Sequence, residues 1–149
     1  MPIGEICVRD VVICTRNTTI HQAAQQMRHH HVGDLVVVDE SDGKRIPVGI
    51  ITDRDIVLSV TALNLDPTVF LVGDLVVRPI VNVREDQGIF ETIQCMRMNG
   101  VRRMPVLDRE GSLAGIISTD DLIQLLADEM SELAKLISQE QTQETQLKQ

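Results

Sequence analysis

The sequence contains almost no aromatic side chains. Its 149 residues include no tryptophan and no tyrosine, and the two phenylalanines are Phe70 and Phe90. Modules that recognise single-stranded RNA or proline-rich peptides stack their ligands on exposed aromatic rings. The composition therefore argues against both kinds of module, and any flat ligand would have to be held between aliphatic side chains.

Cysteines, long apolar runs and positive charges are also scarce. Cys7, Cys14 and Cys95 form no C-x-x-C pair, and such a sparse, odd number is typical of a reducing cytoplasm rather than of a disulfide framework. No apolar run is long enough to span a bilayer and no secretory signal precedes the fold, so we expect a cytoplasmic chain without a membrane contact. The 14 lysines and arginines are outnumbered by 22 aspartates and glutamates, a net charge of −8, which disfavours binding to nucleic acid phosphates.

What the sequence does contain is an internal repeat. Three stretches of the first half return in the second half: 48–56 (VGIITDRDI) as 114–122 (AGIISTDDL), 32–39 (VGDLVVVD) as 101–108 (VRRMPVLD), and 8–11 (VRDV) as 72–75 (VGDL). The spacing between the copies differs slightly from one stretch to the next, and such drift indicates loops of different length. A unit of about 55–60 residues has little core of its own, so we expect the two copies to pack on each other about a pseudo-twofold axis.

Each copy predicts the element order β-α-β-β-α. Apolar residues at helical spacing predict a helix over residues 20–30 and another that begins at Ile89 and ends at Gly100. Short β-branched runs on either side predict the strands. The expected fold class is α+β, with repeats at 6–60 and 70–126, a linker at 61–69, a helix extension over 127–138 and a disordered polar tail at 139–149.

Each copy closes on a strand of the form G-h-h-[TS]-x-x-D, where h is hydrophobic, followed by a helix. The two examples run from Gly49 to Asp55 and from Gly115 to Asp121. With the matched helix and strands before each, this pattern resembles a tandem pair of cystathionine-beta-synthase (CBS) domains over about residues 6–126. The resemblance implies two ligand clefts between the repeats, which in many members bind AMP, ADP, ATP, NAD or S-adenosylmethionine. It also implies flat, disc-like dimers.

The motif offers a ribose site in each copy. An ionised aspartate can accept hydrogen bonds from both vicinal hydroxyls of a ribose. Thr52 with Asp55, and Ser118 with Asp121, would place a hydroxyl and a carboxylate where a strand meets a helix. The alternative interpretation is that each pair only caps its helix, and the two roles are compatible.

The resemblance also implies an adenine pocket and a phosphate site. The family holds adenine with the residue after the motif glycine and with the first strand of the neighbouring repeat, here Ile13, Ile50, Pro79, Ile80, Val81 and Ile116. Plain core packing is the alternative for each of them. Basic residues before the proline-containing strand often bind phosphate, which points to Arg102 and Arg103 unless they are only solvated surface residues.

The two clefts are expected to differ. Adjacent strand residues point to opposite faces, so the sequence predicts that Arg102 and Arg103 serve different clefts. The first copy has Gly33-Asp34 at the matching positions, and a carboxylate would repel a phosphate. One cleft would then stay empty or take a ligand with a cationic group, such as S-adenosylmethionine.

Other polar residues give weaker signals. Consecutive residues of the run 29–31 (HHH) splay about 100° apart on a helix, so no metal site is expected, although His31 at the helix end is a candidate phosphate donor or pH-sensitive group. Cys14 is expected to be a buried structural thiol. No P-loop, no G-x-G-x-x-G motif and no nucleophile beside a base is present.

We therefore expect a regulatory module rather than an enzyme. It would need no cofactor, bind an adenosine-containing effector between its repeats as an energy sensor, and act in trans on an unidentified protein. A homodimer is expected. The alternative is a ligand-free interaction scaffold, suggested by the apolar stripe that continues from Leu122 to Ile137 beyond the repeat.

Overall fold

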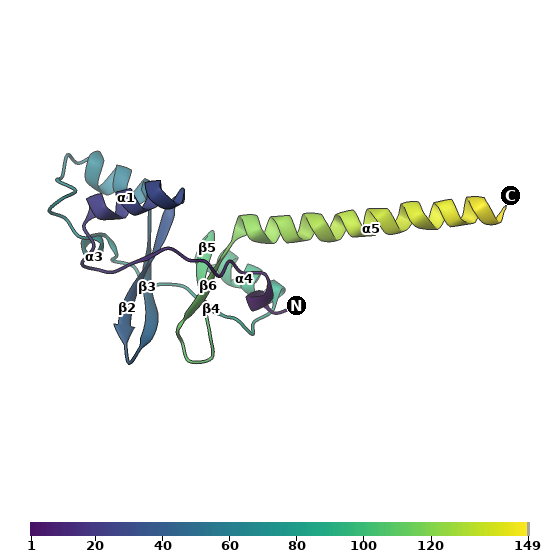
Figure 1. Cartoon of the computed structure of the whole chain (residues 1–149), viewed down its shortest axis with the longest axis horizontal. Coiled ribbons are helices and arrows are strands. Elements are labelled where there is room, and N and C mark those ends of the chain that lie inside the picture. The colour runs from purple at the N-terminus through teal and green to yellow at the C-terminus, as the bar shows by residue number, and fades with distance from the viewer. Residues whose placement is uncertain (149) are drawn as a thin grey trace. The chain divides into compact units, whose positions relative to one another are not determined.

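Two compact units make up the chain. In the computed structural model, which describes residues 1–148, Met1–Ile117 form the first unit and Ser118–Gln149 the second. The β-α-β-β-α order occurs twice, as predicted, and the fold is α+β (Figure 1). The elements of the first half are η1 (Ile3–Glu5), β1 (Ile13–Cys14), α1 (Ile20–His30), β2 (Asp34–Ser41), β3 (Lys44–Thr52), α2 (Asp53–Ile56) and the π-helical turn η2 (Val57–Thr61). Those of the second half are α3 (Val72–Leu75), β4 (Val83–Arg84), α4 (Ile89–Asn99), β5 (Arg103–Leu107), β6 (Leu113–Ser118) and α5 (Thr119–Leu147).

Each repeat builds a three-stranded sheet in the same strand order. The first sheet runs β1-β2-β3 and the second β4-β5-β6. The first strand of each sheet is parallel to the second, and β2 is antiparallel to β3 across a turn in which Asp42 and Gly43 have positive φ. Parallel neighbouring strands need a crossover connection between them. Helix α1 is that connection between β1 and β2, and α4 is the one between β4 and β5. The middle strands carry the most buried residues, with Leu35 to Val38 almost inaccessible.

The core of the first repeat includes a residue from the second half of the chain. Nine buried side chains form this core: Cys14, Ile20, Ala23, Met27, Leu35, Val37, Ile51, Val60 and Val72. All but one of them precede the linker, whereas Val72 lies in α3, beyond it. The first repeat is therefore completed by a segment of the second.

The exchange of segments is reciprocal. The Val72 amide donates to the Thr18 carbonyl at 2.8 Å, and the Ile3 amide donates to the Gln87 carbonyl at 2.7 Å. Figure 1 accordingly shows α3 beside α1 and the N-terminal segment beside α4. Ile3 is thus the counterpart of Val72 in the other repeat. The sequence match of residues 8–11 with 72–75 was wrong, because it aligned similar letters that are out of the structural register.

The two crossover helices end in the same way on different residues. His31 follows α1 with φ 55°, and Gly100 follows α4 with φ 63°. Both are left-handed positions, and both helices end where the sequence predicted. A side chain with a Cβ is strained there, whereas glycine is not.

Replacing His31 by glycine is expected to raise the free energy of unfolding by about 0.5–1 kcal/mol, since it removes this strain. Adding a Cβ at the equivalent position, Gly100→Ala, is expected to lower the free energy of unfolding by about 1 kcal/mol. Urea unfolding followed by circular dichroism measures both. Equal and same-signed effects at the two sites would contradict this account of the helix ends.

The last helix is longer than predicted. The sequence predicted that it would end near Ser138 with a disordered tail over 139–149, but α5 continues to Leu147, and Gln149 lies outside the described residues. The tail is rich in glutamine and glutamate, which are good helix formers, so its polarity does not stop the helix. Among the described residues, no helix combines the length and apolar character needed to cross a membrane.

Candidate functional site

A cleft in the first unit brings residues of both repeats together. Its volume is about 760 Å³, within the range of ligand pockets. Its apolar wall contains Ile50 of β3 and the segment that precedes β4, including three of the predicted adenine-pocket residues, Pro79, Ile80 and Val81. None of the residues that line it is aromatic, so a flat ligand would pack between aliphatic side chains.

The predicted ribose residues of the first repeat line this cleft. The Asp55 amide donates to the Thr52 hydroxyl at 3.1 Å, and the Thr52 amide donates to Asp55 Oδ2 at 2.9 Å. The pair therefore forms a reciprocal capping box at the start of α2, which was the alternative interpretation. Both residues also line the cleft. Only one carboxylate oxygen of Asp55 is used in the box, so the second one is available to a ligand.

Four arginines give the cleft a positive charge. Arg102 and Arg103 both line it, together with Arg54 and Arg78, against the two aspartates Asp53 and Asp55. The prediction that Arg102 and Arg103 serve different clefts was wrong. Arg102 precedes β5 rather than lying in it, so strand alternation does not separate the two side chains. A net positive cleft in a chain of charge −8 is suited to an anionic group.

One of these arginines is paired across the repeats. Arg103 Nη1 donates to Asp34 Oδ2 at 2.6 Å, and both side chains are about one third exposed or less. Asp34 begins β2 and Arg103 begins β5. The carboxylate that the sequence predicted to repel a phosphate is thus bound to a predicted phosphate ligand.

The equivalent edge of the second sheet is covered by the chain itself. The Val8 amide donates to the Ile116 carbonyl and the Ile116 amide donates to the Val8 carbonyl, both at 2.9 Å. The backbone of Ile116, a predicted adenine-pocket residue, is therefore occupied. Among the described residues, the corresponding edge at Ile50 carries no such bridge.

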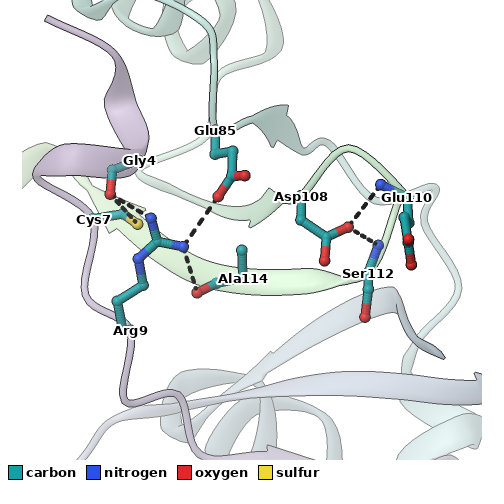
Figure 2. A network of polar contacts seen from close by, with 8 residues as sticks. All are labelled: Gly4, Cys7, Arg9, Glu85, Asp108, Glu110, Ser112 and Ala114. Carbon is teal, nitrogen blue, oxygen red and sulfur yellow. Dashed lines mark hydrogen bonds and ion pairs between the residues drawn. The ribbon is translucent and has the colours of Figure 1, made fainter. Parts of the chain in front are cut away.

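Arg9 holds this covering segment in place (Figure 2). Its guanidinium donates to the carbonyls of Gly4 and Ala114, at 2.6 and 3.3 Å, and pairs with Glu85 at 3.2 Å. Arg78 is its counterpart in the register that pairs Ile3 with Val72, and it lines the open cleft instead. The two repeats thus use equivalent arginines differently.

The remaining predicted site residues are not among those that line this cleft. Ser118 and Asp121 belong to the second unit, where they form the capping box of α5. Ile13 lies in β1, and His31 is exposed at the end of α1; neither lines the cleft. Cys14 is buried, as expected, and burial raises the pKa of its thiol to about 11, so it stays protonated near neutral pH and is a poor nucleophile.

Sequence reasoning missed two arginines of the cleft. Arg54 occupies a variable position inside the G-h-h-T-x-x-D motif, and Arg78 directly precedes the predicted adenine residue Pro79. The sequence did point to both arginines, because each adjoins a residue that had been assigned to a ligand. It did not show in which direction their side chains extend.

A comparison with protein-family models matches the CBS domain twice, over residues 3–61 and 72–128. The chain belongs to the CBS domain family. The two matched segments are the two repeats, and the first of them includes Ile3, in agreement with the structural register. The linker between the matches lies close to the one predicted from the sequence.

Several curated proteins are similar to most of this chain. An uncharacterized protein of Methanopyrus kandleri, MK0525, is 35% identical over 83% of this chain, which spans 61% of that relative. Hypoxic response protein 1 of Mycobacterium tuberculosis is 34% identical over 85% of this chain and 81% of its own length.

Solved structures show the same fold. The crystal structure of hypoxic response protein I, with two coordinated zinc ions, has a TM-score of 0.71 and 31% identity over 83% of this chain and 98% of its own. The CBS pair of protein MJ0100, in complex with 5′-methylthioadenosine and S-adenosyl-L-methionine, has a TM-score of 0.71 and 25% identity over 85% of this chain and 99% of its own.

Proposed function

We propose that this CBS pair is a regulatory module that binds an adenosine-containing ligand in the cleft of its first unit. The observation that carries the proposal is the convergence in one cleft of Thr52 and Asp55 from the first repeat with Arg102 and Arg103 from the second. The hydroxyl and carboxylate suit a ribose, and the guanidinium groups suit a phosphate. The aliphatic wall between them suits the faces of a purine.

A similar CBS pair supports this ligand class. The MJ0100 pair was solved with two adenosyl compounds, and both carry the purine and ribose that the present cleft would accept. The charge of the cleft sets this chain apart, because its four arginines favour a ligand with phosphate groups over one with a cationic sulfonium. AMP, ADP, ATP and NAD are therefore the first candidates.

Binding would act by shifting a conformational equilibrium. The lining residues come from 49–59, 75–81 and 101–103, so a ligand would bridge the two repeats. A ligand that binds one arrangement of the repeats better than another stabilises that arrangement. We propose that a protein partner in the cytoplasm reads this change, with the chain acting as an energy sensor without catalysis of its own.

Isothermal titration of the full chain with AMP, ATP, NAD and S-adenosylmethionine tests the proposal. We expect binding of at least one phosphate-containing ligand with a stoichiometry of one per chain, because the second edge is covered by Val8. An absence of both heat and thermal shift with all four ligands at millimolar concentration would show that the cleft is not an adenosyl sensor.

A second role, self-association, is favoured by the exposed face of α5. Five apolar residues follow one another at alternating steps of three and four: Ile123, Leu126, Met130, Leu133 and Ile137. Each is between 49% and 70% exposed. This spacing is that of the seam of a coiled coil, so we propose that α5 pairs with α5 of a second copy to give a homodimer.

Charge placed in this seam is expected to disrupt the dimer. Leu133→Lys puts a charge on the apolar face and should convert a dimer to a monomer at micromolar concentration, as should removal of residues 128–149. Ser131→Lys places the same charge outside the seam and should leave the dimer intact. Light scattering measures the mass, and a truncated chain that stays dimeric would show that α5 is not the dimer contact.

A further inference from the structure

Asp34 and Arg103 occupy equivalent positions of the two repeats. Each is the first residue of the middle strand of its sheet, and the repeat in the sequence aligns the one with the other. The ion pair therefore joins two positions that the pseudo-twofold relation between the repeats would exchange. A pair of arginines, or a pair of aspartates, would repel each other there, so opposite charges at this one place make the two repeats unlike.

The pair differs from the other ion pairs of the first unit in distance and exposure. Its oxygen and nitrogen lie 2.6 Å apart, and the side chains are 34% and 27% exposed. The Arg16–Asp39 pair, whose aspartate lies on the same strand β2, has a distance of 3.2 Å and side chains that are 47% and 48% exposed. A short, partly desolvated pair is held more firmly than an exposed one.

Arg103 is shared between this pair and the cleft. Arg103 lines the cleft, whereas Asp34 does not, so the guanidinium is the one group that both Asp34 and a ligand in the cleft would contact. The carboxylate presents the same kind of oxygen acceptors to Arg103 that a phosphate would present. It also places a negative charge close to where an anionic group would bind.

We propose that Asp34 determines the charge preference of the cleft, by serving as an internal anion that a ligand phosphate displaces from Arg103. This proposal rests on the proposed function and adds the residue that sets its specificity. The strength of the effect follows the charge of the ligand. Adenosine has no group that competes with Asp34, AMP has one phosphate, and ATP carries the most negative charge of the three.

The Asp34→Asn variant tests the proposal through this series of charges. We expect it to raise the association constant for ATP about tenfold and that for AMP by a smaller factor, because a charged competitor is replaced by a neutral amide. Its affinity for adenosine should stay within about twofold of the original, and S-adenosylmethionine should gain nothing. Titration calorimetry of the full chain at one fixed salt concentration measures all four ligands.

Asp39→Asn is the matched control. It removes the same charge from the same strand, but its partner Arg16 is not among the residues that line the cleft. The ATP-to-adenosine affinity ratio should therefore change by less than about twofold. In a chain that also carries Arg103→Gln, the Asp34→Asn change should lose most of its effect on this ratio, since the guanidinium that pairs with Asp34 is already gone.

The outcomes separate the two proposals. Suppose that adenosine binds the original chain and the Asp34→Asn variant equally, but the ATP-to-adenosine affinity ratio of the variant does not rise. The role of Asp34 as a competitor is then overturned while the proposed function stands. The same holds if the ratio falls, which would mean that Asp34 positions Arg103 for the phosphate. If none of the four ligands binds either protein at millimolar concentration, the proposed function fails and this proposal fails with it. Thermal unfolding of each variant checks that its fold is retained.

Discussion

Asp55→Asn is expected to leave the chain folded while lowering its affinity for adenosine by about tenfold to hundredfold. The asparagine oxygen can still accept from the Thr52 amide, which donates to Asp55 Oδ2 at 2.9 Å, so the capping box at the start of α2 survives. The ionised carboxylate that would accept from the ribose hydroxyls is lost, and hydrogen bonds to charged groups contribute about 1.5–3 kcal/mol. Titration calorimetry with adenosine, paired with thermal unfolding, measures both quantities.

The variant separates the ribose role of Asp55 from its capping role. If the carboxylate only caps α2, affinity and stability should both stay close to those of the unmodified chain. Asp74→Asn is the matched control, because Asp74 accepts from the Leu71 amide at 2.9 Å in a similar cap and does not line the cleft. Both variants remove one negative charge from the chain. Because adenosine is neutral, that change in overall charge does not affect its binding.

A fragment that ends in the linker is expected not to fold. Residues 1–63 lack Val72, which belongs to the buried core of the first repeat. They also lack the carbonyls of Phe70 and Pro67, which accept from the amides of Ile20 and His21 at the start of α1. A unit of this size has little core to lose, so far-ultraviolet circular dichroism should show no cooperative thermal transition.

The longer fragment 1–76 provides the control. It restores Val72 and the whole of α3, and it should regain helical signal and a broad transition that the shorter fragment lacks. A cooperative transition of the fragment 1–63, at a temperature similar to that of the full chain, would contradict the conclusion that the two repeats depend on each other for folding.

Local patterns predicted the elements well because they depend on neighbours in sequence. The apolar spacing of α1 and the left-handed ends at His31 and Gly100 are decided by residues within one or two turns. The motif likewise placed Thr52 and Asp55 at a strand-helix junction, because a capping box needs only four consecutive residues. The order of elements along the chain and its repetition followed from the same local signals.

What the sequence could not predict depends on the direction of side chains and on distant partners. Arg102 and Arg103 were assigned to different clefts on the rule of strand alternation, but the strand begins only at Arg103. The pairing of Arg103 with Asp34 joins residues from different repeats, and no local signal indicates it. The helical tail beyond Ser138 was mistaken for disorder, because composition alone does not distinguish an exposed helix from a flexible chain.

The exchange of N-terminal segments has a consequence for the order of events during synthesis. Ile3 is fully buried, and its amide bonds to the carbonyl of Gln87, in the second half of the chain. At about 5–20 residues per second, the ribosome needs roughly 4–17 s to make that partner after Ile3 itself. Ile3 thus leaves the ribosome well before its native partner does, and during those seconds the growing chain carries Ile3 without the contact that later buries it.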